Sequence, residues 1–399
     1  MMNIKDTYNK LKKLSEGKNA YLFDYVERVK NLDFNELPFS IVDALILSLI
    51  SYYRFDFMEH KANKSLKLEE AEHIYSLDLD LKLTAIYNEA RNPFIKLLAK
   101  TKRYKDLRLF KYERDFSAIH EKQFSAISIE LNKNTVFVSF SGTDSTMTGI
   151  KEDMNMAYLD KIPSQLNAKT YINDRVFKKY KNIYIGGHSK GGNLAIYAGM
   201  KLNHRLQKRI KKIFNFDGPG FIPEILEKDE NKNIIDKIIT IVPEMSVIGM
   251  IFNNPNDLVV IDSFNFGVFQ HDPFSWKINK DNHFAYKNYV SNTSRAISSS
   301  IKDYFQQLDA DKRRQFIDLI WYFTKNTAAY TLSDFKKNFL RNSFNALVLY
   351  GELNSESKKV LHKHLMVFIK SLIIATRKLE EPETKITKET LESLDNFVI

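Results

Sequence analysis

The stretch that decides the fold is IGGHSKGGNLA, residues Ile185–Ala195. Within it, Gly187–Gly191 matches the pattern Gly-x-Ser-x-Gly, with Ser189 at its centre. An apolar segment, Asn182–Gly187, predicts a strand before the serine, and Gly191–His204 predicts a helix after it. A sharp turn between a strand and a helix lifts a serine hydroxyl off the sheet, and the flanking glycines leave room for the backbone. The pattern therefore predicts a nucleophilic serine; the alternative is an ordinary glycine-rich turn, since the phosphate-loop pattern is absent.

Strand and helix patterns alternate on both sides of this turn. Upstream, Phe124–Leu131 and Thr135–Phe140 flank the turn Asn132–Asn134 and predict a β-hairpin. Between the hairpin and the serine motif we expect helix Ala168–Tyr180. After the motif we expect strands Lys212–Phe216, Lys237–Val242 and Leu258–Ile261, followed by helices Ala296–Leu308, Asp311–Phe323, Thr331–Tyr350 and Ser355–Leu379. Short apolar strands alternating with helices predict an α/β fold with a mainly parallel sheet covered on both faces.

These patterns divide the chain into three parts. Residues 1–115 are expected to be a mostly helical N-terminal part packed on the core, residues 116–290 the α/β core, and residues 291–399 a helical C-terminal extension. In the first part, Val42–Tyr53 and Leu66–Asn88 have helical spacing, and Asn92-Pro93 is expected to interrupt the pattern before another helix.

Composition excludes several classes of protein. The 399 residues are 44% hydrophobic and 27% charged, which is typical of a globular chain. There is no cysteine, so disulfide scaffolds, zinc fingers and cysteine nucleophiles are excluded. The net charge of +11 is compatible with transient contact with an anionic membrane surface, but Lys is abundant throughout and no nucleic-acid-binding module is present.

The apolar runs Ile41–Ile50 and Leu365–Ala375 are too short to span a bilayer and no signal peptide is evident, so we expect a cytoplasmic protein.

The serine motif and other segments resemble a known family. Gly187–Gly192 resembles the nucleophile turn of class 3 (fungal-type) lipases, which have the α/β-hydrolase fold. Val138–Ser145 resembles that family's strand ending in a Gly-Thr turn, and Lys151–Asp153 stands where the family places an acidic residue. With Phe216–Phe221 and Gln270–Trp276, these segments are similar to a bacterial branch of these hydrolases. The resemblance implies an α/β-hydrolase core.

A serine nucleophile needs a base, and the chain has nine histidines. In this fold the base follows the last strand, and His362 and His364 lie in the expected C-terminal helices, which leaves His271 and His283. His271 follows the expected strand Leu258–Ile261 after a loop with Phe and Gly, so it is the predicted base, and His283 is the reserve. His188, inside the serine motif, is expected to pack beside the nucleophile.

Three carboxylates are candidates for the acid that orients the base. Asp217 follows strand Lys212–Phe216, Glu244 follows strand Lys237–Val242, and Asp257 precedes the last expected strand. We favour Asp217 because the Gly-Pro-Gly turn after it can expose the carboxylate. The alternative is an aspartate that only hydrogen-bonds its own turn.

Two backbone amides are expected to bind the oxyanion. One is the N–H of Lys190, directly after the nucleophile, and the other is the N–H of Thr143 in the Gly-Thr turn, with the Thr143 hydroxyl as a further candidate donor. Loss of one such donor typically costs about 3–4 kcal/mol of transition-state stabilisation. The alternative is a Gly-Thr turn without a role.

The sequence thus predicts a serine hydrolase that cleaves carboxylic esters with lipid-like acyl groups through an acyl-enzyme on Ser189. We expect no cofactor and no metal; the pair His362 and His364, two residues apart, does not share a helix face. Two alternatives stay open: a binding or regulatory protein that keeps the fold without turnover, and an amidase or thioesterase that uses the same residues. The loop Phe264–Phe269 is expected either to line an acyl pocket or to belong to the core.

Overall fold

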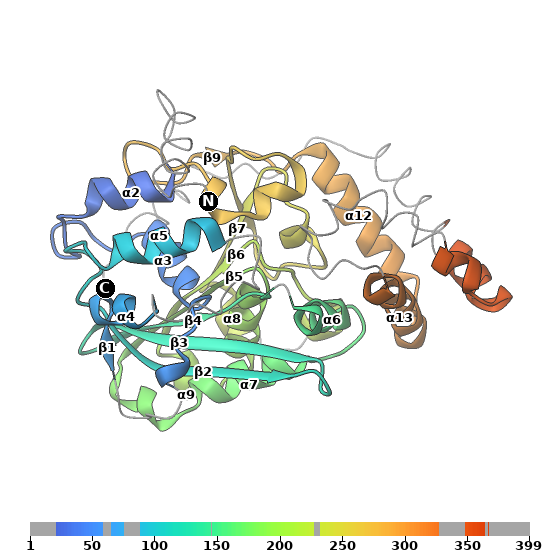
Figure 1. Ribbon diagram of the computed structural model, residues 1–399, viewed down its shortest axis with the longest axis horizontal. Coiled ribbons are helices and arrows are strands. Elements are labelled where there is room, and N and C mark those ends of the chain that lie inside the picture. Colours follow the sequence, from blue (N-terminus) through green and yellow to red (C-terminus); the bar gives the residue numbers. More distant parts are fainter. Residues whose placement is uncertain are drawn as a thin grey trace.

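A nine-stranded sheet forms the centre of the protein (Figure 1). The computed structural model describes residues 21–58, 65–75, 88–144, 146–226, 232–326, 348–363 and 366. The strands are β1 (Leu66–Lys67), β2 (Arg108–Ser117), β3 (Lys122–Asn132), β4 (Thr135–Phe140), β5 (Asn182–His188), β6 (Ile210–Phe216), β7 (Ile238–Pro243), β8 (Leu258–Ile261) and β9 (Tyr286–Lys287).

The helices come before, between and after these strands. The α-helices are α2 (Leu22–Val29), α3 (Ile41–Ile50), α4 (Leu68–Tyr75), α5 (Asn88–Leu98), α6 (Met147–Asn155), α7 (Pro163–Ile172), α8 (Lys190–Lys201), α9 (His204–Gln207), α10 (Pro223–Leu226), α11 (Lys232–Ile235), α12 (Asn292–Gln306) and α13 (Ala310–Asn326). Short 3₁₀ turns are η1 (Asp56–Met58), η3 (Arg175–Lys179), η5 (Ile248–Met250), η6 (Gly267–His271) and η7 (Pro273–Ser275). The residues described include no helix with the length and apolar character of a membrane span.

The strands pair in the order of the sequence, from β1 to β9. Strands β4 to β8 are parallel to one another, and every pairing outside this group is antiparallel. The expectation of a mainly parallel sheet is therefore wrong for the edges and right for the centre. For β2, β3 and β4 the reason is the short turns that join them, which allow only antiparallel pairing, whereas β4 to β6 are joined through helices.

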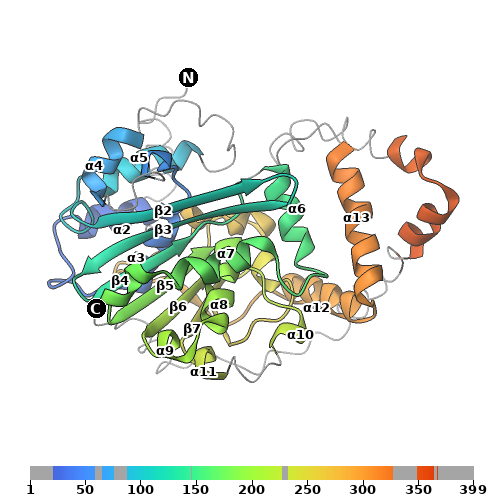
Figure 2. The same ribbon diagram turned by 90° about the horizontal axis from the view of Figure 1, so that it is seen from below.

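Two helical layers cover the sheet (Figures 1 and 2). Helix α3 packs on one face against β4, β5 and β6, and α7 and α8 pack on the other. The strands bury side chains on both faces: Tyr184 and Phe214 point into the core under α3, and Ile185 and Ile213 point into the core under α8. This pattern explains why these strands are apolar without a polar face.

Small residues let α8 lie close to the sheet. A Cβ atom at Gly199 would lie 2.3 Å from Ile213 Cδ1, so a larger residue would require the Ile213 side chain of β6 to shift. The first turn of α8 also lies close to the sheet, because a Cβ atom at Gly191 would lie 2.1 Å from the Phe140 carbonyl oxygen at the end of β4.

Several expected elements differ in extent. The helix expected over Ala168–Tyr180 is divided into α7 and η3, and β2 begins at Arg108, inside the part expected to be helical. Pro93 lies within α5 rather than before it. Most of the expected helices Thr331–Tyr350 and Ser355–Leu379 lies outside the described residues.

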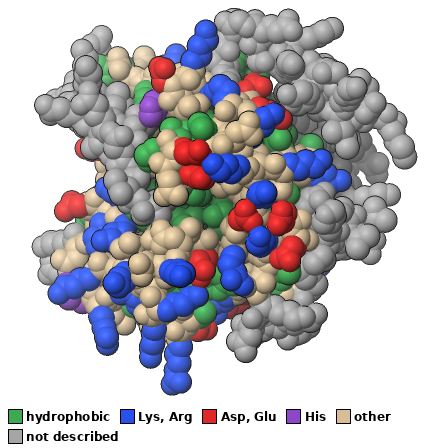
Figure 3. All heavy atoms as spheres, turned by 90° about the vertical axis from the view of Figure 1, so that its left-hand side faces the viewer, with side chains coloured by type: hydrophobic (Ala, Val, Ile, Leu, Met, Phe, Trp, Pro, Cys, Tyr) green, Lys and Arg blue, Asp and Glu red, His purple; other side chains and the backbone are tan. Residues whose placement is uncertain are grey.

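One face of the surface carries side chains of both charges. On the face seen in Figure 3, Lys and Arg side chains are interspersed with Asp and Glu and with apolar groups. Many of the cations are paired, as Lys102 is with Asp33 and Glu36.

Candidate functional site

The turn around Ser189 has the backbone of a strained strand-to-helix junction. Strand β5 ends at His188 and α8 begins at Lys190, so Ser189 is the single residue between them. Its φ of 59° is in the left-handed region, which non-glycine residues adopt at a cost. The turn is held at its centre, because the Ser189 N–H donates to the Phe216 carbonyl oxygen at 2.9 Å.

The Gly142-Thr143 turn lies against Ser189. A Cβ atom at Gly142 would lie 3.0 Å from Ser189 Cβ and 2.1 Å from the Tyr52 hydroxyl oxygen, so only glycine fits. The turn directly follows β4, which is the parallel neighbour of β5, and the ends of the two strands therefore meet. Lys190, the first residue of α8, lies at a position whose N–H has no partner within its own helix.

His271 and Asp217 are joined by a short hydrogen bond. His271 Nδ1 lies 2.6 Å from Asp217 Oδ2, although the two residues are far apart in the chain. The buried Asp217 carboxylate is also held at Oδ1, which accepts from Ser246 Oγ at 2.5 Å and from the Gly249 N–H at 3.2 Å. Asp217 has a φ of 53°, so it is a second strained residue at the same edge of the sheet. The histidine ring is thereby fixed at Nδ1, and Nε2 is left for other chemistry.

The other candidates of the sequence lie elsewhere. Glu244 is 3.5 Å from Lys287 Nζ and half-buried, and Asp257 is exposed. His283 lies in the turn after Asn279, where its N–H donates to the Asn279 side chain. The structure therefore brings Asp217, and neither of the other two carboxylates, to His271.

Thr143 is held by an acidic residue from α6. Its hydroxyl donates to Asp153 Oδ2 at 2.5 Å. The Asp153 side chain is 35% exposed, but its Oδ1 is buried and has no hydrogen-bond partner among the described residues. Burial raises the pKa of Asp153 from its usual range to about 6, against the opposing effect of Lys190. Because the single hydroxyl hydrogen of Thr143 is engaged with Asp153, the backbone N–H is the donor that this residue has for an oxyanion.

The Lys190 side chain is buried in a polar network that the sequence did not reveal. Its Nζ donates to Gln123 Oε1 at 2.6 Å and to the Gln123 carbonyl at 2.8 Å, and it lies 3.0 Å from Glu152 Oε2. Glu152 also accepts from Ser164. The network joins the first turn of α8 to α6 and to the start of α7. A lysine within an otherwise small and apolar segment was the only signal for it in the sequence.

His188 and Tyr52 are two further residues of the site. His188 is buried, and its ring lies 4.6 Å from the His271 ring, centroid to centroid. Its Nδ1 lies 2.8 Å from the Tyr52 hydroxyl and its Nε2 lies 2.9 Å from the His271 carbonyl oxygen. Nothing in the apolar pattern around Tyr52 pointed to this contact, because it joins residues more than a hundred positions apart.

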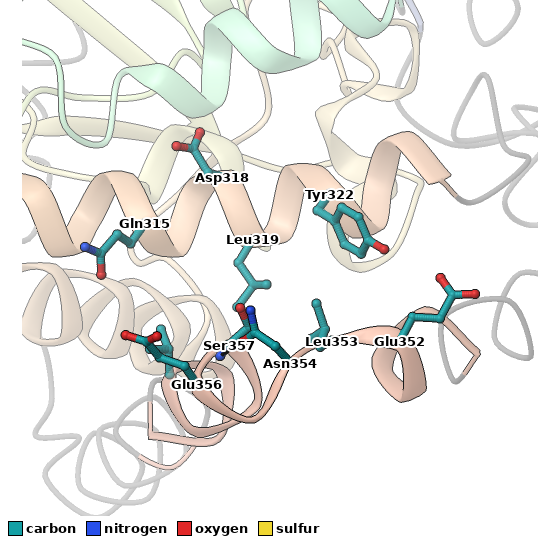
Figure 4. A pocket seen from close by; sticks show the side chains of 10 residues that line it. Gln315, Asp318, Leu319, Tyr322, Glu352, Leu353, Asn354, Glu356 and Ser357 are labelled. Carbon is teal, nitrogen blue, oxygen red and sulfur yellow. Dashed lines mark hydrogen bonds between the residues drawn. The ribbon is translucent and has the colours of Figure 1, made fainter.

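The described residues contain no cluster of three or more side chains suited to holding a metal ion. A cavity of about 570 Å³ lies between α13 and the segment 352–360 (Figure 4). Its lining includes Gln315, Asp318 and Tyr322 on one side and Glu352 and Glu356 on the other. None of the candidate site residues belongs to it.

Comparison with known proteins identifies the family. No curated protein matches the chain. Among solved structures, it is similar to one titled "Crystal structure of M37 lipase", with 14% identity and a TM-score of 0.30 over 52% of this chain and 67% of that chain. The model of the Mbeg1-like family matches residues 98–322, more than half of the 399 residues and the whole segment from β2 to most of α13. The chain therefore belongs to the Mbeg1-like family.

Proposed function

We propose that the protein is a serine hydrolase of α/β-hydrolase type that cleaves carboxylic esters. Ser189 is the nucleophile, His271 the base and Asp217 the acid that orients the base. The observation that carries the proposal is the 2.6 Å contact between His271 Nδ1 and Asp217 Oδ2 at the same edge of the sheet as the strained turn at Ser189.

The proposed reaction uses these three residues in turn. Ser189 Oγ attacks the acyl carbonyl carbon, and its proton passes to His271 Nε2. Asp217 stabilises the imidazolium that forms and holds the ring in the tautomer with hydrogen on Nδ1. His271 then gives the proton to the leaving alkoxide, which departs as the alcohol. Water repeats the sequence on the acyl-enzyme, releases the carboxylic acid and restores Ser189.

The negative charge that develops on the carbonyl oxygen needs donors. The proposed donors are the backbone N–H groups of Lys190 and Thr143. The Lys190 N–H stands at the first position of α8, where the helix dipole also favours negative charge. The close approach of Gly142 to Ser189 supports the second, because it brings the turn with Thr143 beside the nucleophile.

An apolar acyl group is the favoured substrate. Three large apolar side chains, those of Phe266, Val268 and Phe269, are 76%, 47% and 46% exposed in the segment just before His271. Exposed apolar groups beside the proposed base favour contact with an acyl chain or with a lipid surface over contact with a polar substrate.

The test is covalent labelling and turnover. Wild-type protein should react with a fluorophosphonate probe and hydrolyse p-nitrophenyl esters, and Ser189→Ala should do neither while its circular dichroism stays unchanged. Ester turnover at the wild-type rate in Ser189→Ala would end the proposal. Absence of labelling in well-folded wild-type protein would instead favour a binding protein that has the fold without turnover.

A further inference from the structure

The two ring nitrogens of His188 have contacts that determine its tautomer. A backbone carbonyl oxygen accepts hydrogen bonds only, so Nε2, at 2.9 Å from the His271 carbonyl, must carry a hydrogen. The neutral ring then accepts at Nδ1 from the Tyr52 hydroxyl, which lies 2.8 Å from Nδ1 and also 3.2 Å from the His188 carbonyl oxygen. The ring thus acts as a bridge that receives a hydrogen bond from Tyr52 and donates one to the backbone of His271.

The backbone that carries His271 lies outside the sheet. It belongs to η6, a short turn whose first residue, Gly267, has a φ of 56° and whose apolar side chains are exposed. The last two carbonyls of η6 each accept a hydrogen bond from a side chain. Trp276 Nε1 donates to the Gln270 carbonyl at 2.7 Å, and His188 Nε2 donates to the His271 carbonyl.

Tyr52 connects this bridge to a rigid part of the fold. It follows α3, which packs on β4 and β5. The helix is pinned there, because Ser139 Oγ of β4 donates to the Ser48 carbonyl at 3.0 Å and a Cβ atom at Gly186 of β5 would lie 2.6 Å from Ser48 Oγ. The position of the Tyr52 hydroxyl is therefore set by the central strands.

We propose that His188 is a positioning residue for His271, and that Tyr52 orients it for this purpose. Asp217 holds the side chain of His271 at Nδ1, and His188 holds its main chain at the carbonyl oxygen. With both ends fixed, the imidazole has one orientation. The inference rests on the proposed function, in which His271 Nε2 exchanges a proton with Ser189, and it adds the N-terminal helix α3 to the parts that this exchange requires.

The first experiment is Tyr52→Phe, which removes one hydroxyl and leaves the ring. The matched control is Tyr180→Phe, which removes a buried hydroxyl bonded to Glu130 just before β5, at the opposite end of that strand. We expect kcat for a p-nitrophenyl ester to fall about tenfold in Tyr52→Phe with KM within about twofold, the change that loss of one hydrogen bond of typical net strength produces. Tyr180→Phe should leave both constants within about twofold.

The second experiment reads the position of His271 without turnover. The hydrogen between His271 Nδ1 and Asp217 should give a far-downfield proton resonance in wild-type protein, assigned by its loss in Asp217→Asn. The resonance should broaden or shift in Tyr52→Phe and in His188→Phe, and it should be restored in His188→Gln, whose amide can still donate toward the His271 carbonyl. It should be unchanged in Tyr180→Phe.

The outcomes separate the two proposals. Unchanged kcat together with an unchanged resonance in Tyr52→Phe, or a resonance in His188→Phe identical to wild type, would overturn the positioning role. A changed resonance in a protein that fails to hydrolyse any ester would leave the positioning of His271 standing and refute the esterase activity instead.

Discussion

Lys190 and Glu152 form a buried ion pair whose two members depend on each other unequally. Their side chains are 1% and 0% exposed. Without Lys190, the Glu152 carboxylate keeps three donors: the Gln123 N–H at 2.9 Å, the Ser164 N–H at 2.9 Å and Ser164 Oγ at 2.8 Å. Without Glu152, the Lys190 ammonium keeps the two neutral oxygens of Gln123, and the nearest Asp153 oxygen is 3.9 Å away.

The two single substitutions should therefore differ. Removal of one member of a buried pair typically costs about 3–5 kcal/mol, and each buried N–H left without an acceptor adds about 1–3 kcal/mol. Lys190→Met leaves every donor to Glu152 satisfied, so we expect a loss of unfolding free energy near the lower figure, about 3 kcal/mol. Glu152→Leu leaves the Lys190 cation with only the neutral oxygens of Gln123 and leaves the backbone N–H groups of Gln123 and Ser164 without their acceptor, so we expect a loss of about 5 kcal/mol or more.

Equilibrium urea unfolding at neutral pH, followed by fluorescence, measures both losses. The matched control is Lys30→Met, which breaks the exposed pair with Glu27, whose side chains are 48% and 39% exposed, and which should cost less than about 1 kcal/mol. A loss in Lys190→Met equal to or larger than the loss in Glu152→Leu would refute the argument from unequal hydrogen bonding.

Three further predictions concern the proposed acid, the proposed base and Asp153. Asp217→Asn should lower the acylation rate by up to about 10⁴-fold by favouring the wrong tautomer of His271, whereas Glu244→Gln should change it little; equal effects would contradict the choice of acid. His271→Ala should lower the rate of fluorophosphonate labelling by orders of magnitude and His283→Ala should not, and the reverse order would move the base to His283. Burial raises the pKa of Asp153 to about 6, so the folded state binds a proton there that the unfolded state releases near pH 4. The stability of wild-type protein relative to Asp153→Asn should thus fall as the pH rises from about 4 to about 6, and a difference that is constant across this range would contradict the shift.

Much of the fold could be predicted from the sequence because its signals are local. The turn at Ser189 follows from glycines that leave room for the backbone, and the strands β5 to β8 from short runs of apolar residues, each found within one or two residues of its expected bounds. The hairpin of β3 and β4 was predicted in the same way, from alternation and a turn of Asn and Lys. Each of these signals lies within a dozen residues of the chain.

The contacts of the site were decided by tertiary structure. The spacing of Asp217, Glu244 and Asp257 gave three acceptable acids, and only the packing of the loops after β6 and β8 brings Asp217 to His271. The hydrogen-bond partners of Lys190 and His188 could not be predicted either, because the sequence does not indicate which distant side chain will lie next to a lysine or a histidine. The antiparallel pairing at the edges of the sheet was not predicted for the same reason. Pairing direction and helix ends depend on contacts between segments, whereas periodicity describes one segment at a time.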